Sequence, residues 1–129
     1  MSLAHATVGA MRGRIARSGA RGERTAARHL RRRGWRVLAR NWRGSGGELD
    51  LVVARGDVVA MVEVKTRADP AARAEPVTAA QRARIARAAA AFLAARPALV
   101  ERTIRFDVIV VGAGWPPPVR HIAAAWEPA

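Results

Sequence analysis

The sequence has no cysteine, a single lysine, few acidic residues and no long apolar run. Without cysteine, neither a disulfide framework nor a thiolate metal site can form. No apolar stretch approaches the ~18 residues of a membrane-spanning helix. Residues 1–11 are mildly apolar, but their charges follow the run, which is not the order of a signal peptide. We therefore expect a cytoplasmic protein with no membrane partner.

The shortage of acidic residues leaves a large positive charge. The chain has 10 Asp and Glu against 23 Lys and Arg, which gives a net charge of +13. A preference for Arg over Lys preserves charge, so it does not explain this excess of basic residues. We therefore expect a polyanionic partner, with nucleic acid favoured over membrane or acidic protein.

A length of 129 residues suits one domain with a single core. Residues 1–20 lack periodicity and predict a mobile basic N-terminal arm, either a disordered tail or an arm that settles on phosphates. Residues 21–129 then form one domain. Periodicity and turn residues predict helices and strands, in the order αβββαβ with one further edge strand, over residues 22–33, 35–42, 46–53, 58–67, 78–95, 103–111 and 119–126. This order predicts an α/β fold, a mixed β-sheet flanked by helices.

The central hairpin brings acidic residues together. Gly56-Asp57 suits a tight turn between two valine-rich runs. A turn centred there places Asp50 opposite Glu63 and Glu48 opposite Lys65. Because side chains alternate along a strand, these four share one face, and the opposite face takes Leu49, Leu51, Val53, Val58, Val62 and Val64.

Two carboxylates placed opposite each other destabilise a sheet unless a cation lies between them. With Glu48 and Lys65 included, the cluster has a charge of minus two. Mg²⁺ binds one or two carboxylates, keeps several waters and accepts phosphate oxygens. The pair Asp50 and Glu63 thus indicates a divalent-cation site. The alternative is a solvated face with cross-strand ion pairs.

Lys65 is the only lysine in the chain, since all other Lys and Arg positions hold Arg. A genome that favours Arg replaces Lys wherever any positive charge suffices. Retention of Lys beside two carboxylates therefore indicates a role that needs a compact ammonium, because a planar guanidinium is not equivalent to it.

Two helices begin their inward stripes with a polar residue. Glu23 precedes Ala26, Ala27 and Leu30 on the first stripe, and Gln81 opens the second. We expect both to face one polar corner near the carboxylates. For Glu23 the alternative is a favourable charge at a helix N-terminus.

Two polar residues interrupt the apolar strand over 103–111. Arg105 and Asp107 are expected to form a structural ion pair. His121 lies alone in the sequence, and we assign it no chemistry.

The order and spacing of several motifs resemble the YraN-like family of small bacterial proteins, which is grouped with PD-(D/E)xK endonucleases and Holliday-junction resolvases. Asp50, Glu63 and Lys65 follow the pattern D-x₁₂-E-x-K. The similarity covers about residues 21–126. It rests on Gly22-Glu23, Ala26-Ala27, Leu30, Gly34, Asn41, Gly47-Glu48-Leu49-Asp50-Leu51, Val62-Glu63-Val64-Lys65-Thr66-Arg67 and Arg105-Phe106-Asp107-Val108.

This resemblance implies a restriction-endonuclease-like core and a Mg²⁺- or Mn²⁺-dependent DNA endonuclease, with DNA favoured over RNA and branched DNA as one substrate. Asp50 and Glu63 would hold the metal, and Lys65 would orient water or stabilise the phosphorane. The assisting site residues would be Glu48, Glu23 and Gln81, although the family often has Lys at the Gln81 position. Independently of the resemblance, Arg43 and Arg67 lie nearest the cluster in the sequence and Arg82 lies off the apolar stripe of its helix, so these three are expected to contact phosphates. A resolvase also needs two active sites, hence a homodimer.

Two other functions account for the charge. One is a nucleic-acid-binding module that keeps the fold but does not cut. The other is a structural role in a ribosome or another RNA-rich assembly. The binding module does not explain the Asp50/Glu63 pair beside the only lysine. Metal-dependent stabilisation would argue against the structural role.

Overall fold

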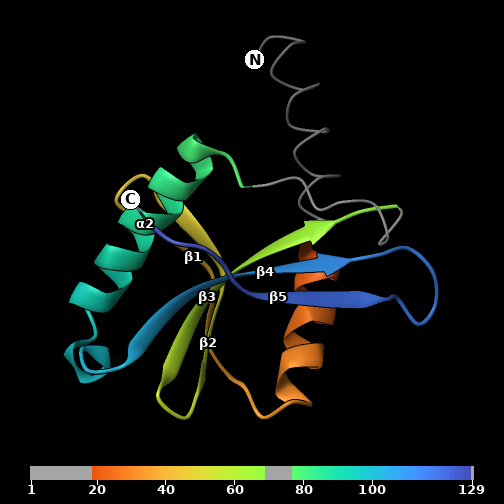
Figure 1. Cartoon of the computed structure of the whole chain (residues 1–129), viewed down its shortest axis with the longest axis horizontal. Coiled ribbons are helices and arrows are strands. Elements are labelled where there is room, and N and C mark those ends of the chain that lie inside the picture. Colours follow the sequence, from red (N-terminus) through yellow and green to blue (C-terminus); the bar gives the residue numbers. More distant parts are fainter. Residues whose placement is uncertain (1–18, 69–76, 129) are drawn as a thin grey trace, which may run out of the picture.

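A five-stranded sheet runs through the molecule, with strands ordered as in the chain (Figure 1). The computed structural model describes residues 19–68 and 77–128. Neighbouring strands are antiparallel except β3 and β4, which are parallel. The strands are β1 (Arg36–Gly44), β2 (Gly47–Arg55), β3 (Val58–Thr66), β4 (Thr103–Val111) and β5 (Val119–Trp126). The predicted α/β fold is confirmed, and it is consistent with a restriction-endonuclease-like core.

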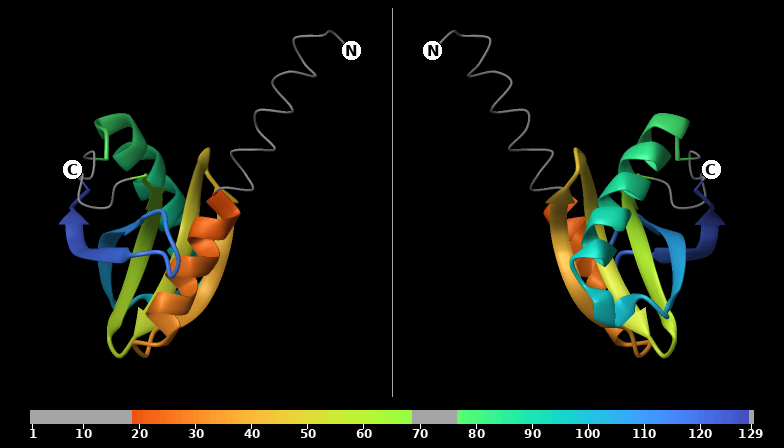
Figure 2. Two further views of the ribbon diagram at one scale, coloured as in Figure 1. Left: turned by 90° about the vertical axis from the view of Figure 1, so that its right-hand side faces the viewer. Right: turned by 90° about the vertical axis from the view of Figure 1, so that its left-hand side faces the viewer.

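One helix covers each face of the sheet (Figure 2). α2 (Ala79–Ala94) makes the crossover that joins the parallel strands β3 and β4, and the 3₁₀ turn η1 (Pro97–Leu99) follows it. The N-terminal helix, residues 19–31, packs on the opposite face. The predicted basic arm lies outside the described residues, apart from residues 19 and 20, which are helical.

Local sequence signals set where the helices begin and end, close to the predicted positions. Thr78 and Gln81 form a capping box at the start of α2, in which each side chain accepts a hydrogen bond from the other's backbone N–H. At the end of the N-terminal helix, the Leu30 carbonyl accepts from the Trp35 N–H at 3.0 Å. Gly34 makes this turn with a φ of +88°, a conformation that suits glycine.

The core is divided between the two faces of the sheet. On the α2 face, the buried side chains include Val52, Val59, Met61, Phe92 and Trp126. On the face of the N-terminal helix, the buried side chains are Ala26, Ala27, Leu30, Trp35, Leu51, Val53, Ala60, Val62, Ile109 and Val111. Both faces of β2 and β3 are therefore apolar along most of their length, and the acidic residues of the two strands lie toward the end away from the turn.

The hairpin register predicted from the turn is confirmed by the pairing of Leu51 with Val62. The face predicted for Leu49 is wrong. Its side chain packs in the core beneath α2, whereas Leu51 packs on the opposite face of the sheet. Leu49 pairs with Trp42 of β1, and the Trp42 ring meets Phe92 of α2 at 5.4 Å. Beyond Leu51, β2 is paired only with β1, so Leu49 follows β1 toward α2.

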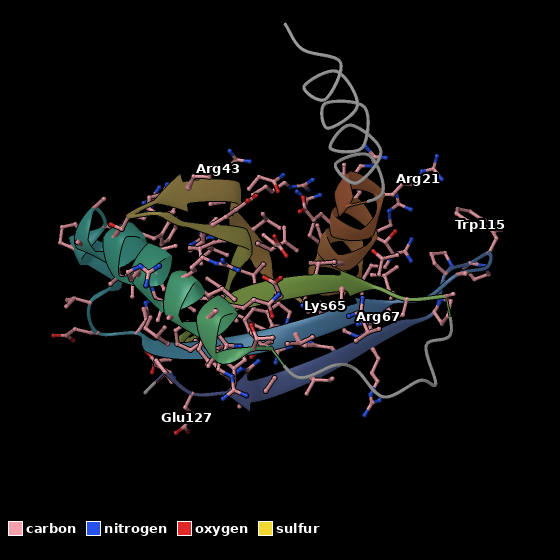
Figure 3. All side chains as sticks on the ribbon, turned by 90° about the horizontal axis from the view of Figure 1, so that it is seen from above. Arg21, Arg43, Lys65, Arg67, Trp115 and Glu127 are labelled. Carbon is pink, nitrogen blue, oxygen red and sulfur yellow. The ribbon has the colours of Figure 1, made fainter. Side chains whose placement is uncertain are left out.

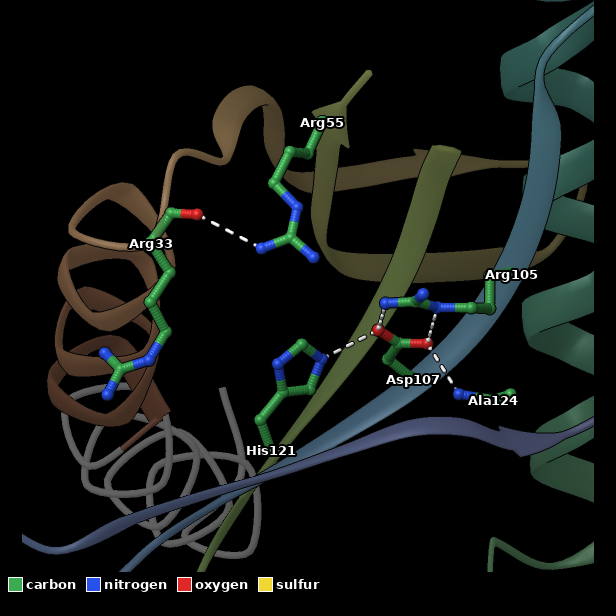
Figure 4. Close-up of polar contacts among 6 residues, drawn as sticks. All are labelled: Arg33, Arg55, Arg105, Asp107, His121 and Ala124. Carbon is green, nitrogen blue, oxygen red and sulfur yellow. Dashed lines mark hydrogen bonds and ion pairs between the residues drawn. The ribbon is translucent and has the colours of Figure 1, made fainter. Parts of the chain in front are cut away.

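A buried carboxylate ties the edge strand β5 to β4 (Figure 4). Asp107 is fully buried, and both of its oxygens accept hydrogen bonds from the Arg105 guanidinium at 2.9 Å. His121 Nε2 lies 2.7 Å from Asp107 Oδ2, and the Ala124 N–H donates to Oδ1 at 2.9 Å. The predicted ion pair of Arg105 with Asp107 is confirmed. His121, to which no chemistry was assigned from the sequence, also binds the Asp107 carboxylate.

Candidate active site

The acidic residues lie where β2 and β3 separate. The pairing of these strands ends at Leu51 and Val62, although β2 extends back to Gly47 and β3 onward to Thr66. The Val64 N–H donates to Asp50 Oδ2 at 2.9 Å. A carboxylate thus accepts a hydrogen bond from a backbone N–H just past the end of the β2–β3 ladder, and it is held at the opening between the strands.

Asp50 and Glu63 share a hydrogen bond at this opening. Burial and the neighbouring charge of Asp50 raise the pKa of Glu63 to about 8. Burial also raises the pKa of Asp50, although hydrogen bonds from Val64 and Glu63 oppose the rise. In metal-free protein at neutral pH, Glu63 is therefore mostly protonated.

Lys65 lies close enough to both carboxylates to stabilise their charged forms and lower the pKa of each. Glu48 acts in the opposite direction and raises the pKa of both. Glu48 also forms an exposed ion pair with Arg43, whose Nε lies 3.7 Å from Glu48 Oε2. The hairpin therefore brings Glu48, Asp50, Glu63 and Lys65 together, as the alternation of side chains predicted.

Glu23 reaches this group from the N-terminal helix. Burial raises the pKa of Glu23, a hydrogen bond with Asn41 lowers it, and the charges of Asp50 and Glu48 raise it further. Asn41 has a φ of +47°, which is uncommon for a residue other than glycine. Sequence reasoning missed Asn41 as a functional candidate, although its place in the family motif and the tolerance of Asn for positive φ were available signals.

A glycine allows the N-terminal helix to approach the end of β3. A Cβ atom on Gly22 would lie 2.8 Å from Thr66 Oγ1, closer than ordinary packing permits. This contact places the residue after Gly22, which is Glu23, beside the end of the strand that carries Glu63 and Lys65. A larger residue at position 22 would push the helix away from the acidic group.

The acidic residues open into a cavity of about 750 Å³ between the β1–β2 hairpin and α2. A Cβ on Gly47 would lie 2.1 Å from the Arg84 carbonyl oxygen, so only glycine allows this close approach of the hairpin to α2. The lining residues are Arg43, Gly44, Gly46, Gly47, Glu48, Asp50, Glu63, Gln81, Arg84 and Ile85.

The remaining predicted site residues differ in their surroundings. Gln81 lines the cavity, but its side-chain oxygen is also used in the capping box with Thr78. Arg82 has structural partners instead, because its Nε donates to the Val77 carbonyl at 2.9 Å and its guanidinium lies 6.0 Å from the Trp126 ring. Arg84, instead of Arg82, is the α2 arginine that lines the cavity.

Arg67 follows the end of β3, and Figure 3 shows it beside Lys65. Its guanidinium donates to the Thr66 carbonyl at 2.9 Å, and its backbone N–H donates to Val111. Its position near Lys65 is compatible with the predicted contact to a substrate phosphate.

The carboxylate pair fits a hard divalent cation. Asp50 and Glu63 are in hydrogen-bond contact, and burial together with their like charges disfavours ionisation of both in the absence of a cation. No group of three or more His, Cys, Asp or Glu side chains suitable for a metal occurs in the described part of the chain. Two carboxylates are the donor set that Mg²⁺ uses when waters and phosphate oxygens complete its shell.

We expect the metal-free protein to lose stability as the pH rises from about 5 to about 8. Folding raises the pKa of Glu63 from 4.5 to about 8, so the folded state binds this proton more tightly than the unfolded chain. The free energy of unfolding is therefore highest below the unfolded pKa and falls as the pH approaches the folded one. The upper limit is about 5 kcal/mol, and we expect ~2–3 kcal/mol because Glu63 is partly open to water. Urea unfolding in EDTA measures this.

Glu63→Gln should flatten this pH dependence, whereas replacement of the exposed Glu101 by Gln should leave it intact. Mn²⁺ added at pH 8 should raise the free energy of unfolding of the wild type but change that of Glu63→Gln little, because the variant lacks the titrating carboxylate. A Glu63→Gln variant with the wild-type slope would show that another group carries the proton.

The family model that matches residues 22–111 is that of the uncharacterised protein family UPF0102. The chain belongs to this family. The matched range contains every residue of the site described above, from Glu23 to Arg84.

Curated UPF0102 relatives agree with this assignment. The UPF0102 protein amb4503 of Paramagnetospirillum magneticum is 52% identical over 115 residues, which are 86% of this chain and 88% of the relative. The UPF0102 protein of Parvibaculum lavamentivorans is 44% identical over 113 residues, which are 87% and 83% of the two chains. UPF0102 protein gll3754 of Gloeobacter violaceus is 44% identical over 107 residues, which are 78% of this chain and 85% of the relative. The resemblance to the YraN-like family is thereby confirmed.

No helix within residues 19–68 and 77–128 is both long and apolar enough to cross a membrane.

Proposed function

We propose that this UPF0102 protein is a Mg²⁺- or Mn²⁺-dependent endonuclease that hydrolyses phosphodiester bonds in DNA. The observation that supports this most strongly is the Asp50/Glu63 pair beside Lys65, at the opening between two strands and next to a cavity of about 750 Å³. A chain with a net charge of +13 otherwise has little reason to gather carboxylates in one place.

Asp50 and Glu63 would hold the metal ion. A bound Mg²⁺ or Mn²⁺ would activate the attacking water and offset charge on the scissile phosphate. Asp50 is positioned for this by the Val64 N–H, which fixes one carboxylate oxygen and leaves the other for further contacts.

Lys65 acts as a cation. Its ammonium faces the same carboxylates, where it can orient the attacking water or stabilise the negative charge that builds on the phosphate oxygens. Glu23 and Glu48 face the same position, and the hydrogen bond from Asn41 orients Glu23. Both are suited to position water beside the reacting phosphate.

Arginines at the rim of the cavity bind the flanking phosphates. Arg43 on β1 and Arg84 on α2 line the cavity from opposite sides, and Arg67 lies beyond Lys65. Gly46 carries no side chain, and no neighbouring atom lies within 4 Å of the position a Cβ would take, so a nucleic-acid backbone can approach the hairpin closely at this point. Phosphate contacts of this kind position a strand without reading its sequence.

The test is cleavage of labelled linear, nicked, flapped and four-way-junction DNA with Mg²⁺, with Mn²⁺ and with EDTA. We expect cutting with either metal and none in EDTA, and the four substrates rank the preferred DNA structure. Asp50→Asn protein purified in parallel controls for contaminating nucleases. Cutting that persists in EDTA would contradict the proposal, and a preference for junctions would call for the predicted homodimer.

A non-cutting nucleic-acid-binding module is the second candidate. One observation favours it: the shared proton on Asp50 and Glu63 relieves their repulsion without a metal. Strong DNA binding without cutting under any of these conditions would establish this function and exclude the nuclease.

A further inference from the structure

A second hollow surface lies away from the carboxylates, between the N-terminal helix and the β4–β5 loop, residues 112–118. It consists of two adjoining cavities of about 550 and 400 Å³, which share Thr25, Arg28, Trp115 and Pro117. Because the two cavities have four lining residues in common, they form one continuous surface. We call it the helix–loop groove.

Trp115 lies in the loop wall of this groove with 88% of its surface exposed. The hydrogen bond from the Gly112 N–H to the Pro118 carbonyl closes the loop at 2.8 Å, and three prolines after Trp115 restrict its backbone. The loop therefore presents an indole that contributes little to the core. A side chain held this way can bind a planar group without first losing much conformational entropy.

The helix wall of the groove is strongly positive. Arg21, Arg24, Arg28 and Arg32 are exposed on one side of the N-terminal helix, opposite the apolar stripe that packs on the sheet. At about 1.5 Å per residue this row extends for about 16 Å along the helix. None of the four has an ion-pair partner in the described part of the chain, and the described lining of the groove contains no carboxylate.

A row of arginines beside an exposed aromatic ring matches the chemistry of a single nucleic-acid strand. Arginines bind its phosphates, and an unpaired base stacks on the ring. A duplex offers the phosphates but not the ring contact, because each base is already covered by its neighbours. The groove is therefore better suited to an unpaired strand than to a duplex.

The groove leads to the carboxylate site. Its lining includes Thr66, the residue after Lys65 on β3. Gly22 of the helix wall packs directly against Thr66. Figure 3 shows Arg21 and Trp115 at the same end of the molecule. A strand bound in the groove would therefore emerge next to the proposed cleavage site.

We propose that the helix–loop groove binds an unpaired strand of DNA, with one base stacked on Trp115 and the phosphates on Arg24 and Arg28. This inference deepens the proposed function: the preferred substrate is DNA in which a single strand emerges beside the scissile phosphate, as at a flap or fork. Trp115 lies outside the residues 22–111 that the family model matches, so the prediction concerns this chain's own residue.

Binding in EDTA tests the groove independently of cleavage. The probes are a fluorescently labelled oligothymidine, the blunt duplex of the same length and a flapped duplex, followed by fluorescence anisotropy. We expect the single strand and the flap to bind more tightly than the duplex. Trp115→Ala should weaken single-strand and flap binding about tenfold, and duplex binding less than twofold. Trp115→Phe should restore most of the loss, because it keeps an aromatic face.

Two further variants separate stacking from charge. The double variant Arg24→Ala/Arg28→Ala should weaken binding and lower the salt dependence, by about 1.4 in the slope of log K against log salt for the single strand. Val100→Ala, at the other strongly exposed apolar residue described, should change nothing.

An equal loss of duplex and single-strand binding in Trp115→Ala, or no loss, would overturn the proposal. A change in oligomeric state on this substitution with unchanged DNA binding would instead identify the loop as a contact between copies of the chain. If the protein binds flaps through Trp115 but does not cut them, the groove stands and the nuclease proposal fails.

Discussion

Lys65→Arg should slow DNA cleavage at least ~10²-fold while DNA affinity stays within about twofold. Arg keeps the positive charge but not the compact ammonium, and its planar fork cannot occupy the same position between Asp50, Glu63 and a phosphate. Loss of one preorganised electrostatic contact in a transition state typically costs about 10²–10³ in rate. Single-turnover cleavage at saturating protein, with binding measured separately in EDTA, separates the two effects.

Asp50→Asn should have at least as large an effect on cleavage, because it removes a proposed metal ligand without changing the size of the side chain. Its matched control is Glu127→Gln, an exposed carboxylate that Figure 3 shows far from Lys65. We expect this control to cut at the wild-type rate.

Lys65→Arg protein with full activity would mean that Lys65 supplies only charge, and the proposed role of its geometry would be wrong.

Asp107→Ala should lower the free energy of unfolding by about 3–5 kcal/mol, because it leaves the buried part of Arg105 and the His121 ring without their shared partner. Burial acts to raise the pKa of Asp107, but hydrogen bonds from His121, Arg105 and the Ala124 N–H together hold it below its usual range. The stabilisation by Asp107 is therefore present above the unfolded pKa, near 4, and is lost as the pH falls through the folded pKa. Urea unfolding at pH 7 measures the loss.

Asp57→Ala is the control for this substitution. Asp57 is an exposed carboxylate in the β2–β3 turn, and we expect its loss to cost less than ~1 kcal/mol. If Asp107→Ala is no more destabilising than this control, the buried cluster does not hold β5 on the sheet. Because acid loss at Asp107 occurs below the pH range in which Glu63 titrates, the two effects can be measured in one protein.

Much of the carboxylate site was predictable because it depends on local rules. A tight turn at Gly56-Asp57 and the two-residue period of a strand are sufficient to place Asp50 opposite Glu63. The capping box at Thr78 likewise depends only on residues three apart. Composition alone drew attention to Lys65 as the only lysine.

The parts that could not be predicted depend on contacts between distant segments. The separation of β2 from β3 beyond Leu51 follows from the continued pairing of β2 with β1, which turns Leu49 toward α2. Arg84 rather than Arg82 lies at the cavity because packing against the sheet sets the rotation of α2. Residues two positions apart on a helix point about 200° away from each other. Only one of Arg82 and Arg84 can therefore face the cavity, and the sequence alone does not determine which.

The sequence by itself determined the α/β fold, the hairpin register and the pairing of Asp50 with Glu63 beside Lys65. The tertiary structure decided between the two roles open for Glu23. It alone showed that Asn41 joins this group, that His121 binds Asp107, and that Trp115 lies across from a row of arginines. The physical reason is the range of the interactions. Turn geometry, capping and strand alternation act over a few residues, whereas the meeting of a helix, a sheet end and a loop depends on how the whole core packs.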